Sequence, residues 1–283
     1  MEKGIGMRER NLAGGWYPDD AAEIRSLVSN WTRLQKNLSA FAVVAPHAGW
    51  YFSGDLAAKA VWSLRDCDTV VILGGHLRRG DPLLFAEEGR FDCTVREAEN
   101  DVQLLDALMS ELKSVGIKEI APDRDIDNSV EILLPLAALR FPQERFICLR
   151  VPPDYKAREL GSALTRAATT CGKRLALIAS TDLTHYGPNY GFMPHGIGES
   201  AVAWVRDEND RGFIAAALNM DADKVIAHAR DRFSACSSGA VAAAISFSFN
   251  SGARRGVLIG HKLSYDVHPD SSFVGYAAIA FVP

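Results

Sequence analysis

The sequence predicts an α/β protein with a mostly parallel central sheet and helices on both faces of that sheet. Short apolar runs rich in β-branched residues recur along the chain, and such runs are typical of buried strands. They lie at residues 41–44, 69–73, 145–151 and 175–179. Segments with helical spacing of apolar residues separate them, and this alternation favours parallel strands joined by helices.

Helices in the first half of the chain are assigned from their caps and their apolar spacing. Asp19 is expected to cap a helix over residues 19–35, and a second helix is expected to start at Gly54. A third helix is expected over residues 97–113. Pro135 lies inside the next apolar helix, where it should either kink the helix or mark its first turn.

The second half of the chain continues the alternation. A helix is expected over residues 157–170, and two more over residues 197–231, the second capped near Asp221. A helix of small apolar residues should follow Gly239. Two strands, over residues 256–265 and 272–282, are expected to complete the sheet.

Composition excludes several classes of partner. The 283 residues carry a net charge of −4 without a basic block, so no nucleic-acid partner is expected. The longest apolar runs are far short of the ~20 residues that span a bilayer. The N-terminus lacks the apolar core of a signal peptide, so the cytoplasm is the expected location, with no membrane partner. Five cysteines without close pairs argue against a disulfide framework and against CxxC zinc sites.

Three of the strand-like runs are followed by a histidine. His47 comes after Ala45-Pro46, His76 after Gly74-Gly75, and His185 follows the run that ends at residue 179. Cys236 precedes the small-residue helix, where free N–H groups and the helix dipole favour a thiolate. Because ligands of open α/β sheets bind at the carboxyl ends of the strands, these four side chains are expected to share one edge.

Such a set of residue types is suited to a transition metal. Imidazole and thiolate ligands bind iron, copper or zinc, and a His/His/Cys set with an open position is typical of a catalytic site. Asp182, three residues before His185, is expected to orient a ring nitrogen. The alternative is a coincidence of dispersed residues, because the chain has no compact HxxxH motif.

Other residues have two interpretations each. Glu131 heads an apolar helix, where a glutamate is ordinarily a capping or dipole-complementing residue, and it also lies near the expected site. The aromatic residues Trp50, Tyr51 and Tyr186 should either line a pocket over the metal or pack in the core. Motifs of serine hydrolases, dinucleotide-binding proteins and P-loop enzymes are missing from the sequence.

Beyond these patterns, the chain contains an ordered series of short blocks. They are AGGWYP from Ala13, PHAGWY from Pro46, LGGH from Leu73, NSVE from Asn128, STDLTHYG from Ser180, Cys236 and GYAA from Gly275. These blocks resemble those of the Memo family, whose microbial members are called AmmeMemoRadiSam system protein B. The resemblance covers nearly the whole chain, which implies one domain over residues 1–283. It also implies a fold similar to that of the class III extradiol dioxygenases.

The resemblance also implies roles for individual residues. His47, His76 and Cys236 correspond to metal ligands, with the cysteine in the place of a carboxylate. His185 corresponds to an acid/base, with Asp182 beside it. The metal would be iron foremost, or copper or zinc, and the activity that of a metal-dependent oxidoreductase or dioxygenase relative.

The resemblance further suggests a radical-SAM partner protein, whereas the substrate remains an unknown small molecule or peptide. The alternative function is a non-enzymatic module that binds a peptide or protein and keeps a degenerate metal site. Two departures from the family pattern favour an altered site. Asn128 stands where the family usually has a histidine, and the loop Gly74–Leu77 is shorter than usual, while Glu131 is kept.

Overall fold

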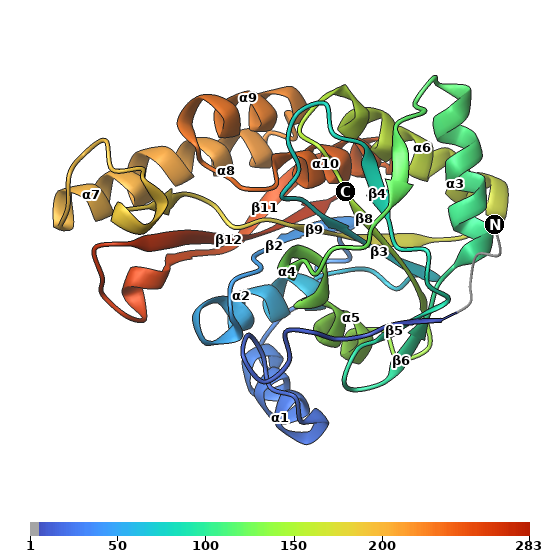
Figure 1. The fold of residues 1–283 in the computed structure, drawn as a ribbon, viewed down its shortest axis with the longest axis horizontal. Helices are drawn as coiled ribbons and strands as arrows, with labels where there is room; N and C mark the ends of the chain where they lie inside the picture. Colours follow the sequence, from blue (N-terminus) through green and yellow to red (C-terminus); the bar gives the residue numbers. More distant parts are fainter. Residues whose placement is uncertain (1–5) are drawn as a thin grey trace.

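A computed structural model describes residues 6–283 and shows an α/β fold built on one large sheet (Figure 1). Within these residues the sheet has nine strands, in the order β10-β12-β2-β9-β3-β8-β4-β7, with β11 also paired to β12. The strands are β2 (Ala42–Ala45), β3 (Thr69–Gly74), β4 (Leu83–Phe85), β7 (Ile120–Pro122), β8 (Arg145–Arg150), β9 (Leu175–Ser180), β10 (His185–Tyr186), β11 (Arg255–Leu263) and β12 (Phe273–Val282).

The α/β class expected from the sequence is confirmed, and the parallel pairing lies at the centre of the sheet. Strands β2, β9, β3 and β8 are parallel neighbours. The flanks are mixed, because β12 runs antiparallel to β2 and to β11, and β4 runs antiparallel to β8. The carboxyl ends of β2, β9 and β3 therefore lie side by side, with Ala45 opposite Ser180.

Helices cover both faces of the sheet (Figure 1). Strand residues alternate between two apolar cores, as the two-residue period of a strand requires: Val71 and Leu73 face one core, and Val70 and Ile72 face the other. The first core contains α3 (Val102–Ser114), α6 (Tyr155–Cys171), α8 (Asp210–Leu218), α9 (Ala222–Arg232) and α10 (Ser238–Ser251).

The second core lies on the opposite face. It contains residues of α1 (Ala21–Thr32), α2 (Trp50–Trp62), α4 (Asn128–Glu131) and α5 (Leu134–Arg140). A small three-stranded sheet formed by β1 (Met7–Arg8), β5 (Arg90–Asp92) and β6 (Glu97–Glu99) lies at its edge. In the described part of the chain, no helix has the length and apolarity needed to cross a bilayer.

Among the element boundaries that differ from the sequence prediction, three have a clear structural cause. The cap of α1 is Asp20, which accepts a hydrogen bond from the Glu23 amide, rather than Asp19. Helix α2 begins at Trp50 rather than Gly54, because the Trp50 side chain packs in the core and donates its Nε1–H to the Ile132 carbonyl. Residues 97–99 form a strand, because they pair with β5, and α3 starts only after its cap at Asp101.

Two other expectations hold. Pro135 lies in the first turn of α5, where its missing N–H costs no hydrogen bond. Asp221 caps α9 by accepting from the Lys224 amide. Earlier in the chain, helix α7 (Glu199–Trp204) continues into α8 through a π-helical turn at residues 205–209. This turn places Asn209 and Asp210 in the protein interior.

Candidate metal centre

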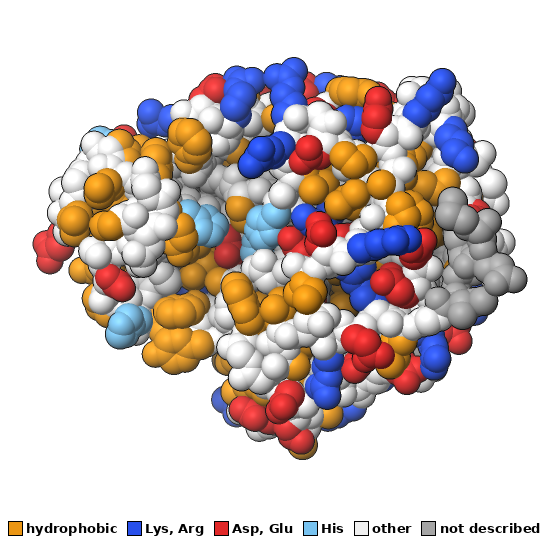
Figure 2. Space-filling view, in the orientation of Figure 1, with side chains coloured by type: hydrophobic (Ala, Val, Ile, Leu, Met, Phe, Trp, Pro, Cys, Tyr) orange, Lys and Arg blue, Asp and Glu red, His pale blue; other side chains and the backbone are white. Residues whose placement is uncertain are grey.

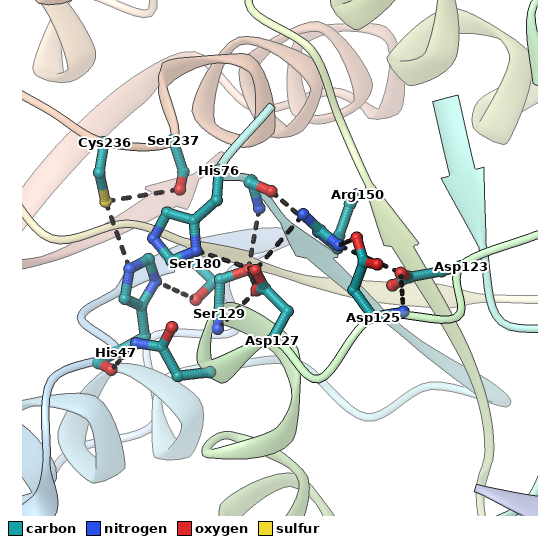
Figure 3. Close-up of polar contacts among 12 residues, drawn as sticks. His47, His76, Asp123, Asp125, Asp127, Ser129, Arg150, Ser180, Cys236 and Ser237 are labelled. Atoms are coloured by element: carbon teal, nitrogen blue, oxygen red, sulfur yellow. Dashed lines mark hydrogen bonds and ion pairs between the residues drawn. The ribbon is translucent and has the colours of Figure 1, made fainter. Parts of the chain in front are cut away.

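Two histidines and a cysteine meet at the carboxyl edge of the sheet (Figure 3). His47 follows β2, His76 follows β3, and Cys236 lies in the loop that enters α10. One ligand atom from each of the three side chains lies within 4.8 Å of the other two. The structure therefore brings together three of the four side chains that the sequence placed at this edge.

His47 is held rigidly in this group. Its ring is buried, with Nδ1 2.8 Å from the Ser180 Oγ and Nε2 3.2 Å from the Cys236 Sγ. The His47 backbone N–H donates to Asp182 Oδ1 at 2.7 Å, and its carbonyl accepts from the Asn128 amide at 3.0 Å. Contacts with both the backbone and the ring therefore fix Nε2 as the atom that faces the cysteine.

His76 reaches the group through an unusual backbone. A Cβ at Gly75 would overlap the Ser237 side chain, so only glycine fits where the loop passes the entrance to α10. His76 itself has a φ of 58°, in the left-handed region that non-glycine residues rarely adopt. Its Nδ1 lies 3.0 Å from Asp127 Oδ2, which leaves Nε2 as the ligand atom.

Asp127 is fixed in turn by buried groups (Figure 3). Its carboxylate accepts from both the N–H and the hydroxyl of Ser129. Arg150, only 4% exposed, lies 3.4 Å from Asp127 and donates to the Gly75 carbonyl at 3.0 Å. The same guanidinium pairs with Asp123 at 3.1 Å and with Asp125 at 2.8 Å. The position of His76 is thus supported by an ionic network beneath it.

In the absence of a metal, the charges of the site stabilise the Cys236 thiolate and the protonated imidazoles, whose protons a bound metal ion would displace. Burial alone would raise the pKa of the Cys236 thiol, but His47 and His76 outweigh burial and hold that pKa well below its usual range. Burial also opposes protonation of His76, whereas Asp127 and Cys236 raise its pKa to about 10. For His47, Cys236 and Asp182 outweigh burial and raise the pKa. Burial raises the pKa of Asp182, despite the attraction of His47.

These features fit a transition metal ion. A thiolate is the form of cysteine that binds metal, and both imidazoles present Nε2 while Nδ1 contacts an oxygen. Two nitrogen ligands and one sulfur ligand suit zinc, iron or copper. A cavity of about 730 Å³ reaches Cys236, so the group has an open side.

His185 lies near the group without belonging to it. Its backbone pairs with Val274 of β12, and its Nδ1 lies 3.1 Å from the Leu183 carbonyl. The expectation that Asp182 orients a ring nitrogen is wrong, because its carboxylate accepts from the His47 backbone instead. The charge of His185 nevertheless contributes to the low pKa of Cys236.

The aromatic residues do not form the expected pocket over the metal. Trp50 is buried against Tyr17 and Trp31, and Tyr186 is buried in a separate apolar cluster with its hydroxyl on the Gly196 carbonyl. Tyr51 is 73% exposed. Core packing, the alternative interpretation, is correct for Trp50 and Tyr186.

Glu131 has a structural role that neither sequence interpretation included. Its Oε1 accepts from the backbone N–H groups of Asn11 and Leu12 at 2.8 and 2.7 Å, and from the Tyr17 hydroxyl at 3.1 Å. Glu131 therefore fastens residues 11–17 to the start of the α4–α5 segment. Asp127 rather than Glu131 caps α4, whereas Glu131 does lie in the first turn of that helix, where an acidic residue complements the helix dipole.

The sequence alone did not reveal Asp127, Ser180 or Arg150 as partners of the site. Asp127 belongs to the acidic segment 123–131, and this local concentration of acidic residues was the only sequence feature that pointed to a role near the site. Ser180 and Arg150 are the last residues of β9 and β8. Their position at the carboxyl edge of parallel strands was a usable signal.

The fold and this group of side chains define an α/β protein with a His/His/Cys group that could hold a metal ion. The chain belongs to the Memo family, since the family model for Memo-like proteins matches residues 8–280. A MEMO1 family protein of Methanococcoides burtonii is 29% identical over 280 residues, covering 96% of this chain and 99% of that protein. A MEMO1 family protein of Archaeoglobus fulgidus is 30% identical, covering 97% and 99%.

A solved structure shares the fold. The crystal structure of an uncharacterized protein from Escherichia coli K12 superposes with a TM-score of 0.54 and 11% sequence identity, covering 85% of this chain and 98% of that one. At this identity the similarity concerns the arrangement of helices and strands alone.

Proposed function

We propose that the protein binds a transition metal ion through His47, His76 and Cys236 and functions as a metal-dependent oxidoreductase. The observation that carries this proposal is the convergence of three ligand atoms within 4.8 Å at the carboxyl edge of the sheet. Iron is the metal we favour, with copper or zinc as alternatives, because imidazole and thiolate ligands suit all three. The dioxygenase relationship comes from the family resemblance.

The chain's own residues have defined tasks in this proposal. His47 and His76 present Nε2 because Ser180 and Asp127 hold Nδ1. Cys236 supplies the anionic ligand, and Asp182 keeps the His47 backbone in place. His185, whose ring lies at the margin of the site, is the residue we propose to move a proton to or from a bound substrate. When bound, the metal would supply redox or Lewis-acid chemistry.

Metal analysis by mass spectrometry tests the proposal. The protein would be purified without a metal-binding tag and reconstituted anaerobically with Fe²⁺, Cu⁺ or Zn²⁺ in separate experiments. We expect about one ion per chain in the wild type, and loss of that ion in Cys236→Ala and His47→Ala. Cys171→Ala and His268→Ala, which change the same residue types outside the site, are the matched controls and should retain the metal.

Two results would overturn this function. Wild-type protein that takes up none of the three metals would support the non-enzymatic binding module instead. Equal metal content in Cys236→Ala and wild type would place the metal elsewhere. Ring cleavage requires a separate assay, in which Fe²⁺-loaded protein is given catechol and O₂. A radical-SAM protein as partner rests on the family resemblance alone, and co-purification of the two proteins would test it.

A further inference from the structure

The cavity beside Cys236 has a distinct chemical character. Its volume of about 730 Å³ lies within the range of about 300–1,000 Å³ that is usual for small-molecule sites. Its walls come from the loop after β3, the start of α6, helix α9 and the segment before α10. In Figure 2 the surface is hollowed near the histidine side chains at the centre of the view, and Lys and Arg side chains lie at the upper margin.

In the described part of the chain, two of the charged residues of the wall have no carboxylate partner. Three others already have partners: Asp154 pairs with Lys156 at 3.1 Å, Asp223 with Arg158 at 2.7 Å, and Arg230 with Asp231 at 2.7 Å. Arg78 and Arg79 also line the cavity, and within residues 6–283 neither side chain is paired with a carboxylate. Both arginines are exposed residues of the wall, so their guanidinium groups are available to an anion that enters the cavity.

Asp154 does not neutralise these arginines. Its carboxylate is almost fully buried and accepts from the Lys156 and Gly80 backbone N–H groups at 2.9 and 3.0 Å, in addition to the Lys156 ammonium. The Gly80 contact ties the loop that carries Arg78 and Arg79 to the start of α6. The arginines are thus presented by a loop anchored at its base, an arrangement that limits the ordering cost of binding an anion.

Apolar residues also line the cavity, and one of them is a strained aromatic residue. Ile226 and Ala229 of α9 line it together with Phe233. Phe233 ends α9 with a φ of 51°, a left-handed conformation that is costly for a bulky side chain, and its side chain is left 65% exposed. Strained residues of this kind cluster at ligand sites. Exposure of a large ring beside a cavity is consistent with stacking on a ligand.

We propose that this cavity binds a small organic anion. Its oxyanion group would accept hydrogen bonds from Arg78 and Arg79, and its apolar part would lie against Ile226, Ala229 and Phe233. A carboxylate and a phosphate monoester share the oxygen geometry that guanidinium groups recognise. Because the cavity reaches Cys236, the bound anion lies beside the metal ligands. Its identification as the substrate class rests on the proposed function, whereas its binding does not.

Calorimetric titration of the metal-free full-length protein tests the proposal. The probes are phenylpropionate, phenylethyl phosphate and the neutral phenylpropionamide. We expect both anions to bind, and the amide to bind about tenfold more weakly than phenylpropionate. The double variant Arg78→Gln/Arg79→Gln should weaken phenylpropionate binding by about tenfold or more. Arg211→Gln/Arg255→Gln removes the same charge from exposed positions outside the cavity and should have no effect.

A second variant tests the apolar wall. Phe233→Ala should weaken phenylpropionate binding severalfold and leave the weaker binding of acetate, which lacks an aromatic ring, unchanged. A phosphate or a carboxylate preference supports the proposal equally and identifies the head group. Equal affinity for the amide and the acid would overturn it, as would equal weakening in the two double variants.

The outcomes for the anion and for the metal are separable. All titrations use metal-free protein, and Arg78→Gln/Arg79→Gln should keep the metal content of the wild type. Anion binding without metal uptake would overturn the proposed function alone. Metal uptake without discrimination between acid and amide would overturn the anion site alone.

Discussion

The Sγ of Cys236 lies 3.2 Å from the Nε2 of His47, although 189 positions separate the two residues in the chain. The contact joins the end of β2 to the entrance of α10. Because His47 is itself fixed by Ser180 and Asp182, the cysteine has a partner whose position does not depend on a bound ion. This relationship gives the site a thiolate ready for metal binding.

Cys236 should therefore react as a thiolate in metal-free protein at acidic pH. A lowered thiol pKa means that the thiolate persists as the pH falls, until the pH passes below the lowered value. At about pH 6, iodoacetamide should modify Cys236 faster than the partly exposed Cys171, as measured by peptide mass spectrometry. His47→Gln should slow the reaction at Cys236. A rate that rises only near pH 8.5, the ordinary range of a thiol, would contradict this prediction.

Asp127 should strengthen metal binding although it is not a ligand. Asp127→Asn keeps the size of the side chain but weakens its hold on His76, so metal affinity should fall by roughly 10- to 100-fold. Competition with a chromophoric chelator would measure the change. Asp125→Asn is the matched control, because Asp125 contacts Arg150 without contacting His76. Equal losses in the two variants would show that Arg150, rather than the His76 contact, is responsible.

The pair of His76 and Asp127 should make metal-free stability depend on pH. Asp127 and Cys236 raise the pKa of His76 to about 10 in the folded protein, whereas in the unfolded chain it is about 6.5. The protonated His76 therefore contributes its full stabilisation of the folded protein below about pH 6.5. It decreases as the pH rises and is lost above about 10. The lowered pKa of Asp127 preserves the pair as the pH falls toward 4.

Urea unfolding of the wild type and His76→Gln would measure this dependence. The partly exposed pair should make the wild type more stable by about 0.5–1 kcal/mol at about pH 5.5, with a smaller difference at about pH 10.5. His268→Gln, at an exposed position outside the site, is the matched control. A difference that grows with pH would have the wrong sign for the mechanism.

Glu131 should stabilise the protein without affecting the metal. Glu131→Ala leaves two backbone N–H groups and the Tyr17 hydroxyl without their acceptor, which should cost about 1–3 kcal/mol. Thermal unfolding and limited proteolysis at residues 11–17 would detect the loss. Metal content per folded chain should match the wild type, and a selective loss of metal would instead place Glu131 in the metal site.

The central strands and most helices could be predicted because their signals are local. An apolar run such as 69–73 has few alternatives to a buried strand, and a cap such as Asp221 acts within one turn. The start of α2 could not be predicted in this way, because it depends on contacts of Trp50 with residues distant in the chain: Tyr17, Trp31 and the Ile132 carbonyl. Residues 97–99 became a strand because β5 was available to pair with them.

By itself the sequence determined the α/β class, because apolar periodicity and strand ends are local features of the chain. It also placed His47, His76, His185 and Cys236 at one edge of the sheet, and the family resemblance singled out His47, His76 and Cys236 as candidate ligands. Only the tertiary structure decided that His76 reaches its partners, through a left-handed backbone and the support of Asp127 and Arg150. The structure also showed that Asp182 accepts a hydrogen bond from the backbone N–H of His47, whereas the sequence had suggested a contact with a ring nitrogen. Hydrogen bonds between residues far apart in the chain depend on how the strands pack, and spacing along the chain does not encode that.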